Sequence, residues 1–278
     1  MGTFEAVQEQ YEKNKKAAGG NRFANQEERM KKYFTTVLPK GISSGEKRIR
    51  LLPVKDGGTP FVEAYFHEIQ VDGKYVKLYD PKGEGKRSPL NEVKESLEAT
   101  GVESDKELAK NYRAKKFYII KVIDRDHEAD GPKFWRFKHN AKGEGIMDKI
   151  WPIFKNKGDI TDPEKGRDLT LSLSLTLSNN KKEYTQISSI IHEDPSPLSA
   201  NAEQAQAWIN DELTWSDVYS KKPEEYLEMV ANGETPVWDK EAKKFVSQAQ
   251  AESTVGGAST TVPEDSQADN DPDEELPF

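Results

Sequence analysis

The chain has 278 residues, with 41 Lys and Arg against 49 Asp and Glu, 34% hydrophobic residues, no cysteine and a mean hydropathy of −0.87. The lack of cysteine excludes a disulfide framework, a thiolate zinc site, an iron–sulfur cluster and a cysteine nucleophile. Since no apolar run approaches the length of a membrane span and the first residues lack the apolar stretch of a secretory signal, we expect a soluble, cytoplasmic protein that does not contact membranes.

The charge is unevenly distributed along the chain. Residues 1–192 carry 36 basic and 29 acidic residues, a net charge of +7, whereas residues 193–245 carry five basic and 12 acidic ones. Residues 246–278 add eight acidic residues and no Lys or Arg. A basic body with an acidic tail is typical of a polyanion binder whose tail competes for the same surface, although solvated charge runs are also common.

Composition divides the chain into four regions. The ends are polar, and the last one is rich in Ser, Thr, Gly, Pro and acidic residues with almost nothing to bury, so we expect that tail to be disordered. The regions are a helical, basic N-terminal arm at 1–40, a binding core at 41–195, a helical C-terminal part of the core at 196–245 and the acidic tail at 246–278.

In chain order, the first strand is expected at residues 48–52, followed by a hairpin over residues 66–79 that turns at Asp72-Gly73. Pairing across a two-residue turn places Ile69 opposite Val76 and His67 opposite Leu78 on one face. The other face then carries the aromatic residues Phe66, Tyr75 and Tyr79 beside charged residues. We interpret this second face as a candidate exposed aromatic platform.

The clearest later signal is the alternation of Leu with Thr or Ser over residues 169–177, which predicts a strand with one face in the core. Pro and Gly positions mark the ends of several helices. The other expected elements are strands at 116–123, 133–138 and 184–187, and helices at 92–110 with a break at Thr100-Gly101, at 146–154, at 200–213 with Ser199 as its cap, and at 224–230.

No motif in the sequence indicates an enzyme. Gly41 to Gly45 matches the GxSxG string of a nucleophile elbow, but the predicted strand follows this string instead of preceding it. The loop from Gly83 to Ser88 lacks the first glycine of a phosphate-binding P-loop, because that position is Asp80. The four histidines are far apart, without the spacing of paired metal ligands. We therefore expect a protein that binds and does not catalyse.

Basic and aromatic residues are interleaved on the predicted strands and their loops. Single-stranded nucleic acid needs both, because cations follow the phosphates while exposed rings stack on unpaired bases at about 1–3 kcal/mol each. Any single aromatic residue can equally well pack in the core, so the inference depends on all of these residues taken together. The candidate DNA contacts are the bases Arg50, Lys74, Arg113, Lys115, Lys116, Arg136, Lys138, Lys181 and Lys182, and the rings Tyr75, Tyr79, Tyr112, Tyr118, Trp135 and Tyr184.

The order of several segments resembles the T-even-type phage single-stranded DNA-binding (helix-destabilising) proteins. These segments are Ile49 to Pro53, His67 with Gly73-Lys74-Tyr75, Phe134 to Phe137, and Asp148-Lys149-Ile150. The resemblance covers roughly residues 45–190, together with the basic arm and the acidic tail. It implies a mixed β/α chain whose core is an OB-fold, a five-stranded β-barrel with a basic, aromatic-lined cleft. It also implies a protein that coats single-stranded DNA in phage replication, recombination and repair within the bacterial host cell.

The resemblance also assigns roles to the two ends of the chain. It implies that Lys13, Lys15 and Lys16 support cooperative self-association along the strand, and that the tail recruits a polymerase, a helicase or its loader, or a recombinase. A terminal Phe after an acidic run offers such a partner a hydrophobic anchor and a carboxylate, although a merely solubilising tail is the alternative. The expected partner-binding residues are Asp273, Glu274, Glu275, Leu276, Pro277 and Phe278, of which the last three are similar to the tail tip of bacterial single-stranded DNA-binding proteins.

The family holds a structural zinc with one His and three Cys, and here the sequence departs from it. The matching positions are His67, Asp80, Ser88 and Asn91. Since Ser and Asn are poor zinc ligands, we expect no metal and no other cofactor. The loop must then be held by its own packing, helped by two prolines.

Two other functions stay open. An RNA-binding OB-fold protein would use the same cleft and would prefer RNA over DNA of the same sequence. A protein–protein adaptor that works through its acidic tail and C-terminal helices would have no nucleic-acid affinity.

Overall fold

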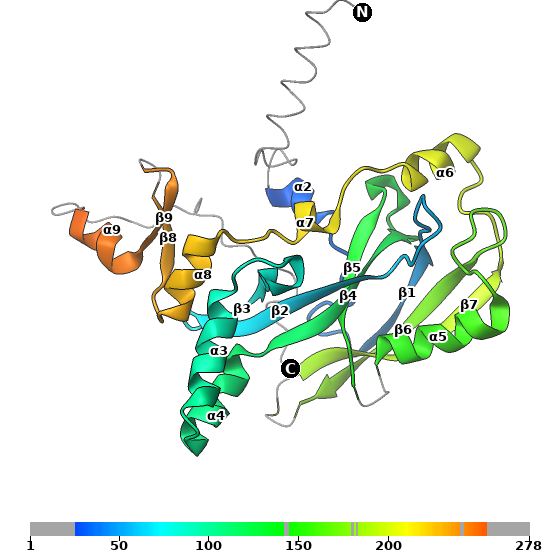
Figure 1. Cartoon of the computed structure of the whole chain (residues 1–278). Helices are drawn as coiled ribbons and strands as arrows, with labels where there is room; N and C mark the ends of the chain where they lie inside the picture. Colours follow the sequence, from blue (N-terminus) through cyan, green and yellow to red (C-terminus); the bar gives the residue numbers. More distant parts are fainter. Residues whose placement is uncertain (1–25, 142–144, 179–180, 182, 240–241, 255–278) are drawn as a thin grey trace, which may run out of the picture.

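The computed structural model describes residues 26–141, 145–178, 181, 183–239 and 242–254 (Figure 1). Within them the chain is mixed α/β, with a seven-stranded sheet in the order β3-β2-β4-β1-β6-β7, β5 pairing with β4, and a separate two-stranded sheet. Every strand ladder is antiparallel. The strands are β1 (Ser44–Leu51), β2 (Val62–Val71), β3 (Lys74–Tyr79), β4 (Ala114–Asp124), β5 (Lys133–Lys138), β6 (Arg167–Leu177), β7 (Glu183–Pro195), β8 (Pro236–Asp239) and β9 (Lys244–Ser247).

The β2–β3 hairpin confirms the predicted register. Ile69 pairs with Val76 and His67 with Leu78. Asp72 and Gly73 both have positive φ, 50° and 75°, as a two-residue hairpin turn of the mirror-image type requires. The side chains on either side of β2 and β3 are therefore fixed by this turn.

Strand β4 is the centre of the sheet. Its first half pairs with β2, its end pairs with β1, and residues 117–122 pair with β5 on the other edge. The segment after α2 (Gln26–Met30) runs between β5 and β7, since the Phe34 N–H donates to the Phe134 carbonyl at 2.9 Å and the Leu38 N–H donates to Thr185 Oγ1 at 2.9 Å. Among the described residues no strand ladder closes the sheet into a barrel.

The main core lies on one face of this sheet, here called the inner face. The predicted alternation in β6 is confirmed for Leu169, Leu171 and Leu173, which are buried there between more exposed residues, but not for Leu177, which is 63% exposed. They pack with Ile49 and Val122 of the neighbouring strands, and helix α5 (Ile146–Lys157) covers the core with apolar side chains. Alternation along each strand thus decides which side chains reach this core.

A second core lies on the outer face of β2, β4 and β5. After β7 the chain returns across this face and contributes Val218 and Tyr219. The Tyr33 hydroxyl donates to the Val218 carbonyl at 2.6 Å, and the Tyr33 and Tyr219 ring centroids are 5.0 Å apart. The described part of the predicted arm, from residue 26 onward, is therefore packed into the body.

The helices follow most of the predictions. The expected break at Gly101 is confirmed, with φ of 71° between two helices. The predicted cap Ser199 is wrong, because the N-cap is Asn201, whose side chain accepts the N–H groups of Glu203 and Gln204. The remaining helices are α3 (Pro89–Ala99), α4 (Glu103–Ala109), α6 (Ala202–Ile209), α7 (Trp215–Val218), α8 (Glu224–Ala231), α9 (Gln248–Thr254) and the 3-10 turns η1 (Pro81–Glu84), η2 (Lys110–Tyr112) and η3 (Glu128–Asp130).

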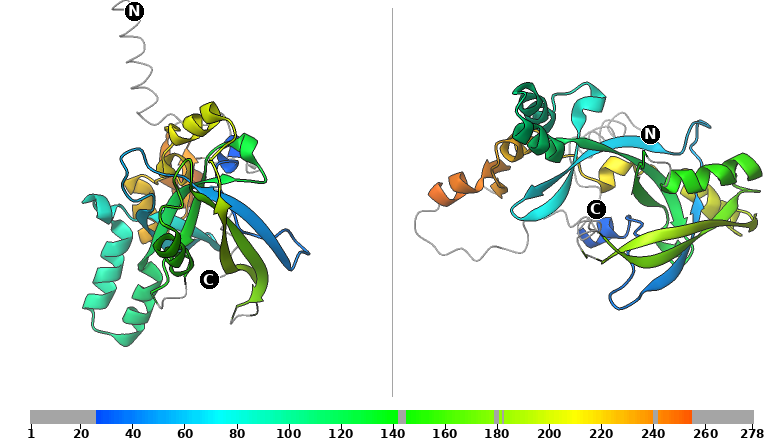
Figure 2. Two further views of the ribbon diagram at one scale, coloured as in Figure 1. Left: turned by 90° about the vertical axis from the view of Figure 1, so that its right-hand side faces the viewer. Right: turned by 90° about the horizontal axis from the view of Figure 1, so that it is seen from below.

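The sequence analysis did not find the β8–β9 hairpin, and it placed residues 246–254 in the disordered tail. These residues instead complete β9 and form α9. Helices α3 and α4 lie beside the β2–β3 hairpin, while α5 lies at the other end of the sheet (Figures 1 and 2). None of the described helices is long and apolar enough to cross a lipid bilayer.

One end of the sheet is held by a buried ion cluster. The guanidinium of Arg50, on β1, is fully buried and lies 3.2 Å from the carboxylate of Asp168, on β6. It also donates to the Ser196 carbonyl at 2.6 Å. Arg125 binds the same carboxylate through two nitrogens, at 2.8 and 2.9 Å. Gly166 borders the cluster, where an added Cβ would come within 2.4 Å of a carbonyl oxygen, so only glycine fits.

Replacing Asp168 with Ala should lower the free energy of unfolding by about 3–5 kcal/mol, because removing one partner leaves buried guanidinium charge without compensation. Chemical denaturation followed by circular dichroism would measure the loss. Glu164→Ala, at a nearby exposed position, is the control and should change stability by less than about 0.5 kcal/mol. A loss of similar size in both variants would contradict a stabilising role of the cluster.

Candidate nucleic-acid interface

A group of rings and cations lies on the inner face of β2 and β4, at the edge of the main core. Alternation along β4 points Lys116 and Tyr118 to the same face as the buried Ile120. The pairing of β2 with β4 puts Tyr65 opposite Lys116, and therefore on this face as well. We call Phe61, Tyr65, Lys116, Tyr118 and His139 the Tyr118 cluster.

Tyr118 is the centre of the cluster and is half-buried. Its ring centroid lies 6.4 Å from that of Phe61 and 5.7 Å from that of His139, both in edge-to-face geometry. The Lys116 ammonium lies 5.1 Å from the Tyr118 ring centroid. The Tyr118 ring also packs on the buried Phe137, at a centroid distance of 5.7 Å and in a tilted geometry. Tyr65, which lies opposite Lys116, is 41% exposed. The arrangement offers aromatic surface that no described element covers completely.

The charge of Lys116 is stabilised locally. Its ammonium is paired with Glu63, which lies opposite Tyr118 on β2. The hydrogen bond to Glu63 raises the Lys116 pKa, so the side chain stays cationic at neutral pH. An exposed pair of this kind is worth little and can exchange its carboxylate for a phosphate.

Other predicted contacts lie on the outer face and are not brought to the Tyr118 cluster. Lys115 and Lys138 both bind the buried carboxylate of Glu68. Burial lowers the Lys138 pKa, and the attraction of Glu68 opposes this shift. Tyr75 lies at the hairpin end of the same face, opposite Gln70, and is 50% exposed. Lys115 and Lys138 on the outer face therefore neutralise the buried carboxylate of Glu68.

Three predicted contacts are wrong because their side chains are buried. Arg50 belongs to the ion cluster with Asp168. Trp135 is 2% exposed and packs in the main core, so it cannot stack on a base. Arg136 is buried under rings, with its guanidinium carbon 4.3 Å from the Tyr219 ring centroid.

The aromatic platform expected on the hairpin is also wrong for two of its three rings. Phe66 and Tyr79 are buried because the C-terminal segment places Trp215 against both, at centroid distances of 6.2 and 5.1 Å. The Tyr79 hydroxyl donates to Glu84 at 2.9 Å, and burial together with this carboxylate raises the Tyr79 pKa to about 12. Tyr79 is therefore a structural residue.

The remaining predicted residues are scattered around the sheet. Lys74 is exposed at the hairpin turn, and Arg113 is exposed just before β4, next to the half-buried Tyr112. Lys181 is exposed beyond the end of β6, and Tyr184 pairs with Thr176 on the face of β7 turned away from the core. The predictions at Lys13, Lys15, Lys16, Lys182 and Asp273 to Phe278 lie outside the described residues.

The positions matching the family's zinc ligands are partly brought together. His67, Asp80 and Ser88 are all buried, and His67 Nε2 lies 3.7 Å from the Asp80 carboxylate. His67 Nδ1 lies 2.7 Å from the Tyr112 carbonyl, which can only accept, so Nδ1 carries the proton. Asn91 binds Glu95 instead, at 2.7 Å. The described residues include no group of three or more His, Cys, Asp or Glu that could hold a metal, and this donor set does not fit zinc.

A polar cluster therefore occupies these positions. Burial raises the pKa of Asp80, but polar contacts from His67 and Ser88 and the backbone N–H of Lys82 outweigh it, so the pKa lies below its ordinary value. The Asp80 carboxylate accepts the Lys82 N–H at 3.1 Å and thereby caps the turn η1. The carboxylate form of Asp80 is thus part of what holds this loop.

Sequence reasoning missed Phe61, Tyr65 and His139. It began the hairpin at Phe66, whereas β2 begins at Val62. Extending the alternation back from Phe66 would have placed Tyr65 on the opposite face, beside the β4 residues already selected. No protein-family model matches the chain, and no curated protein matches it.

Replacing Asp80 with Asn should destabilise the protein by about 1–3 kcal/mol at pH 7, because Asn keeps one acceptor oxygen but loses the negative charge and the second acceptor that the buried polar partners face. The folded-state pKa of Asp80 is below its ordinary value of 3.8, so its contribution is present above that pH and is lost as the pH falls through the folded pKa. The difference between wild type and variant, measured by urea denaturation, should therefore shrink in acid.

Asp72→Asn is the matched control, since Asn also tolerates the positive φ of this exposed turn residue. This variant should match the wild type at both pH values. A difference between Asp80→Asn and wild type that does not change with pH would contradict the role of the Asp80 carboxylate.

Proposed function

We propose that this chain is a non-enzymatic protein that binds single-stranded DNA with little sequence preference. The observation that carries the proposal is the Tyr118 cluster, in which a half-buried ring lies under the Lys116 ammonium and near the exposed ring of Tyr65. Unpaired bases can stack on such rings, whereas the bases of a duplex are already stacked on each other. Exposed Lys74, Arg113 and Lys181 around the sheet can follow the phosphates.

The proposal extends to the fold and its resemblance to the T-even-type phage proteins. We propose that the antiparallel sheet is an open variant of the OB-fold. Three features support this: β1 pairs with both β4 and β6, α5 connects β5 to β6 and covers the main core, and the segment Tyr33–Leu38 bridges the edges of β5 and β7. OB-folds commonly bind single strands across such a sheet face.

The ends of the chain complete the proposed function. The acidic tail would compete with DNA for the basic surface and, once displaced, recruit polymerase, helicase, helicase loader or recombinase through Asp273 to Phe278. Lys13, Lys15 and Lys16 would support cooperative coating of the strand. These roles fit replication, recombination and repair of phage DNA in the host cytoplasm.

The first test replaces Tyr118 with Ala and measures binding of a fluorescent oligo-dT by anisotropy. Affinity should fall by about 1–3 kcal/mol, the value of one stacked base, or roughly 5- to 150-fold. Tyr75→Ala, which removes a more exposed tyrosine from the outer face, should have little effect. Circular dichroism would check that both variants fold.

Equal losses in the two tyrosine variants would contradict the assignment of the inner face. Tighter binding to oligo-U than to oligo-dT would favour the RNA-binding alternative. If the wild-type chain binds neither strand at low salt, the proposed function is wrong and the adaptor alternative leads.

The second test removes residues 255–278, which contain seven acidic residues and leave α9 intact. DNA affinity should rise, most strongly at low salt, because the tail competes electrostatically with phosphates. A chain of full length with these seven residues changed to Asn and Gln should behave like the truncation. Unchanged affinity in both would show that the tail does not cover the DNA site.

A further inference from the structure

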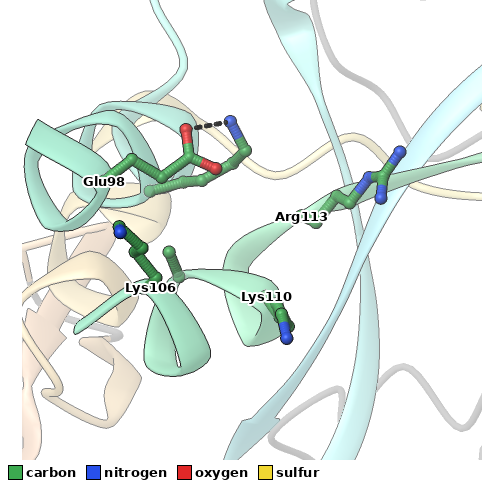
Figure 3. Close-up of a pocket in the computed structure, with 6 residues that line it drawn as sticks. Glu98, Lys106, Lys110 and Arg113 are labelled. Atoms are coloured by element: carbon green, nitrogen blue, oxygen red, sulfur yellow. Dashed lines mark hydrogen bonds and ion pairs between the residues drawn. The ribbon is translucent and has the colours of Figure 1, made fainter. Parts of the chain in front are cut away.

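A basic pocket lies on the pair of helices beside the β2–β3 hairpin (Figure 3). Its cavity measures about 520 Å³. The lining residues are Lys94 and Glu98 of α3, Lys106 and Ala109 of α4, Lys110 of η2, and Arg113. Four cations against one carboxylate make this lining suited to an anion, and the absence of rings from it makes it unsuited to stacking.

The cations of the pocket are only loosely paired. Lys94 binds Glu98 at 2.9 Å and Lys106 binds Glu103 at 3.4 Å, with much of each pair in solvent. Lys110 is likewise paired with Glu107 in an exposed position. Such surface pairs contribute little and can be replaced by contacts to a ligand.

Arg113 is exposed, and Figure 3 shows its side chain extending away from the lysines of α4 and η2. A guanidinium presents a planar fork of donors that matches a phosphate better than an ammonium does. Arg113 is therefore the best placed of the four cations to bind a phosphate on the side of the strands.

The chain connects this pocket directly to the Tyr118 cluster. Arg113 precedes β4, and Tyr118 is five residues further along, a distance of roughly 17 Å at about 3.3 Å per strand residue. Lys116 lies between them on the inner face. A nucleic-acid strand stacked on Tyr118 and running along β4 toward its N-terminal end therefore reaches the pocket within a few nucleotides.

We propose that the pocket binds phosphodiester groups of the single strand that stacks on the Tyr118 cluster. The interface then extends from the sheet onto α3 and α4, and only a strand long enough to span both parts uses the pocket. This inference rests on the proposed function, but it concerns residues that the Tyr118 test does not change.

The experiment compares Lys106→Gln/Lys110→Gln with Lys155→Gln/Lys157→Gln, which removes two exposed lysines from α5 at the other end of the sheet. Affinity is measured for oligo-dT of increasing length at several salt concentrations. For long strands, the slope of log K against log salt should become shallower by about 1.4 in the pocket variant, since each contact to a single strand contributes about 0.7. The α5 variant should keep the wild-type slope, and the shortest strands should show no difference among the proteins.

An unchanged slope in the pocket variant, or equal changes in both variants, would overturn the proposal. If Tyr118→Ala has no effect while the pocket variant loses slope, the stacking site fails and the pocket survives. If Tyr118→Ala weakens all lengths and the pocket variant none, the pocket alone fails.

A second arm separates a strand from a small free anion. Pyrophosphate is titrated at constant ionic strength while the amide NMR signals of residues 106–113 are followed. Weak pyrophosphate binding that the pocket variant loses together with the DNA slope supports the proposal. Saturable pyrophosphate binding without any change in DNA slope would assign the pocket to small anions and overturn the proposal for the strand.

Discussion

The buried cluster of Arg50, Asp168 and Arg125 is the constraint on which the sheet depends. It joins β1 to β6 and draws in the connection after β7 through the Ser196 carbonyl. Buried charges are stable only where their partners are held in place. Separating β1 from β6 would therefore leave a buried charge without its partner. The Tyr118 cluster lies away from this cluster, where rings meet each other mainly at their edges. The sheet is thus fixed by ions at one end and leaves aromatic surface available at another.

The C-terminal segment buries some of the aromatic residues of the sheet and leaves others exposed to solvent. Both faces of β4 carry rings, but Trp215 and Tyr219 pack on the outer face and bury Phe66, Tyr79 and Arg136 there. On the inner face of β4, Ile120 is buried in the main core, whereas Tyr118 packs against this core and stays half-buried. The outer face of β4 is therefore buried under a distant part of the chain, whereas Tyr118 on its inner face keeps part of its surface exposed.

Features set by residues near one another in the chain could be predicted from the sequence, whereas burial by distant segments could not. The hairpin register, the break at Gly101 and the alternation over Leu169 to Leu173 in β6 depend on residues close together in the chain, and these three features were predicted correctly. The burial of Arg136 depends on Tyr219, which is 83 positions away, and that of Arg50 on Asp168, so local patterns could not reveal either. Tyr65 could have been found, because extending β2 back by one residue from Phe66 places it on the opposite face, where it pairs with Lys116 of β4.

The polar cluster of His67, Asp80 and Ser88 connects the two parts of the proposed interface. His67 donates to the carbonyl of Tyr112, the residue before Arg113. Asp80 in turn contacts His67 and caps the turn that leads toward α3. The start of β4 is thereby held against the β2–β3 hairpin by hydrogen bonds that need no metal. Because Tyr118 belongs to the same strand as this anchored start, and α3 follows directly from the capped loop, the position of the pocket relative to the rings is set by buried side chains. A single strand would then meet a surface whose two binding elements are already at a fixed separation, which reduces the ordering that binding must impose.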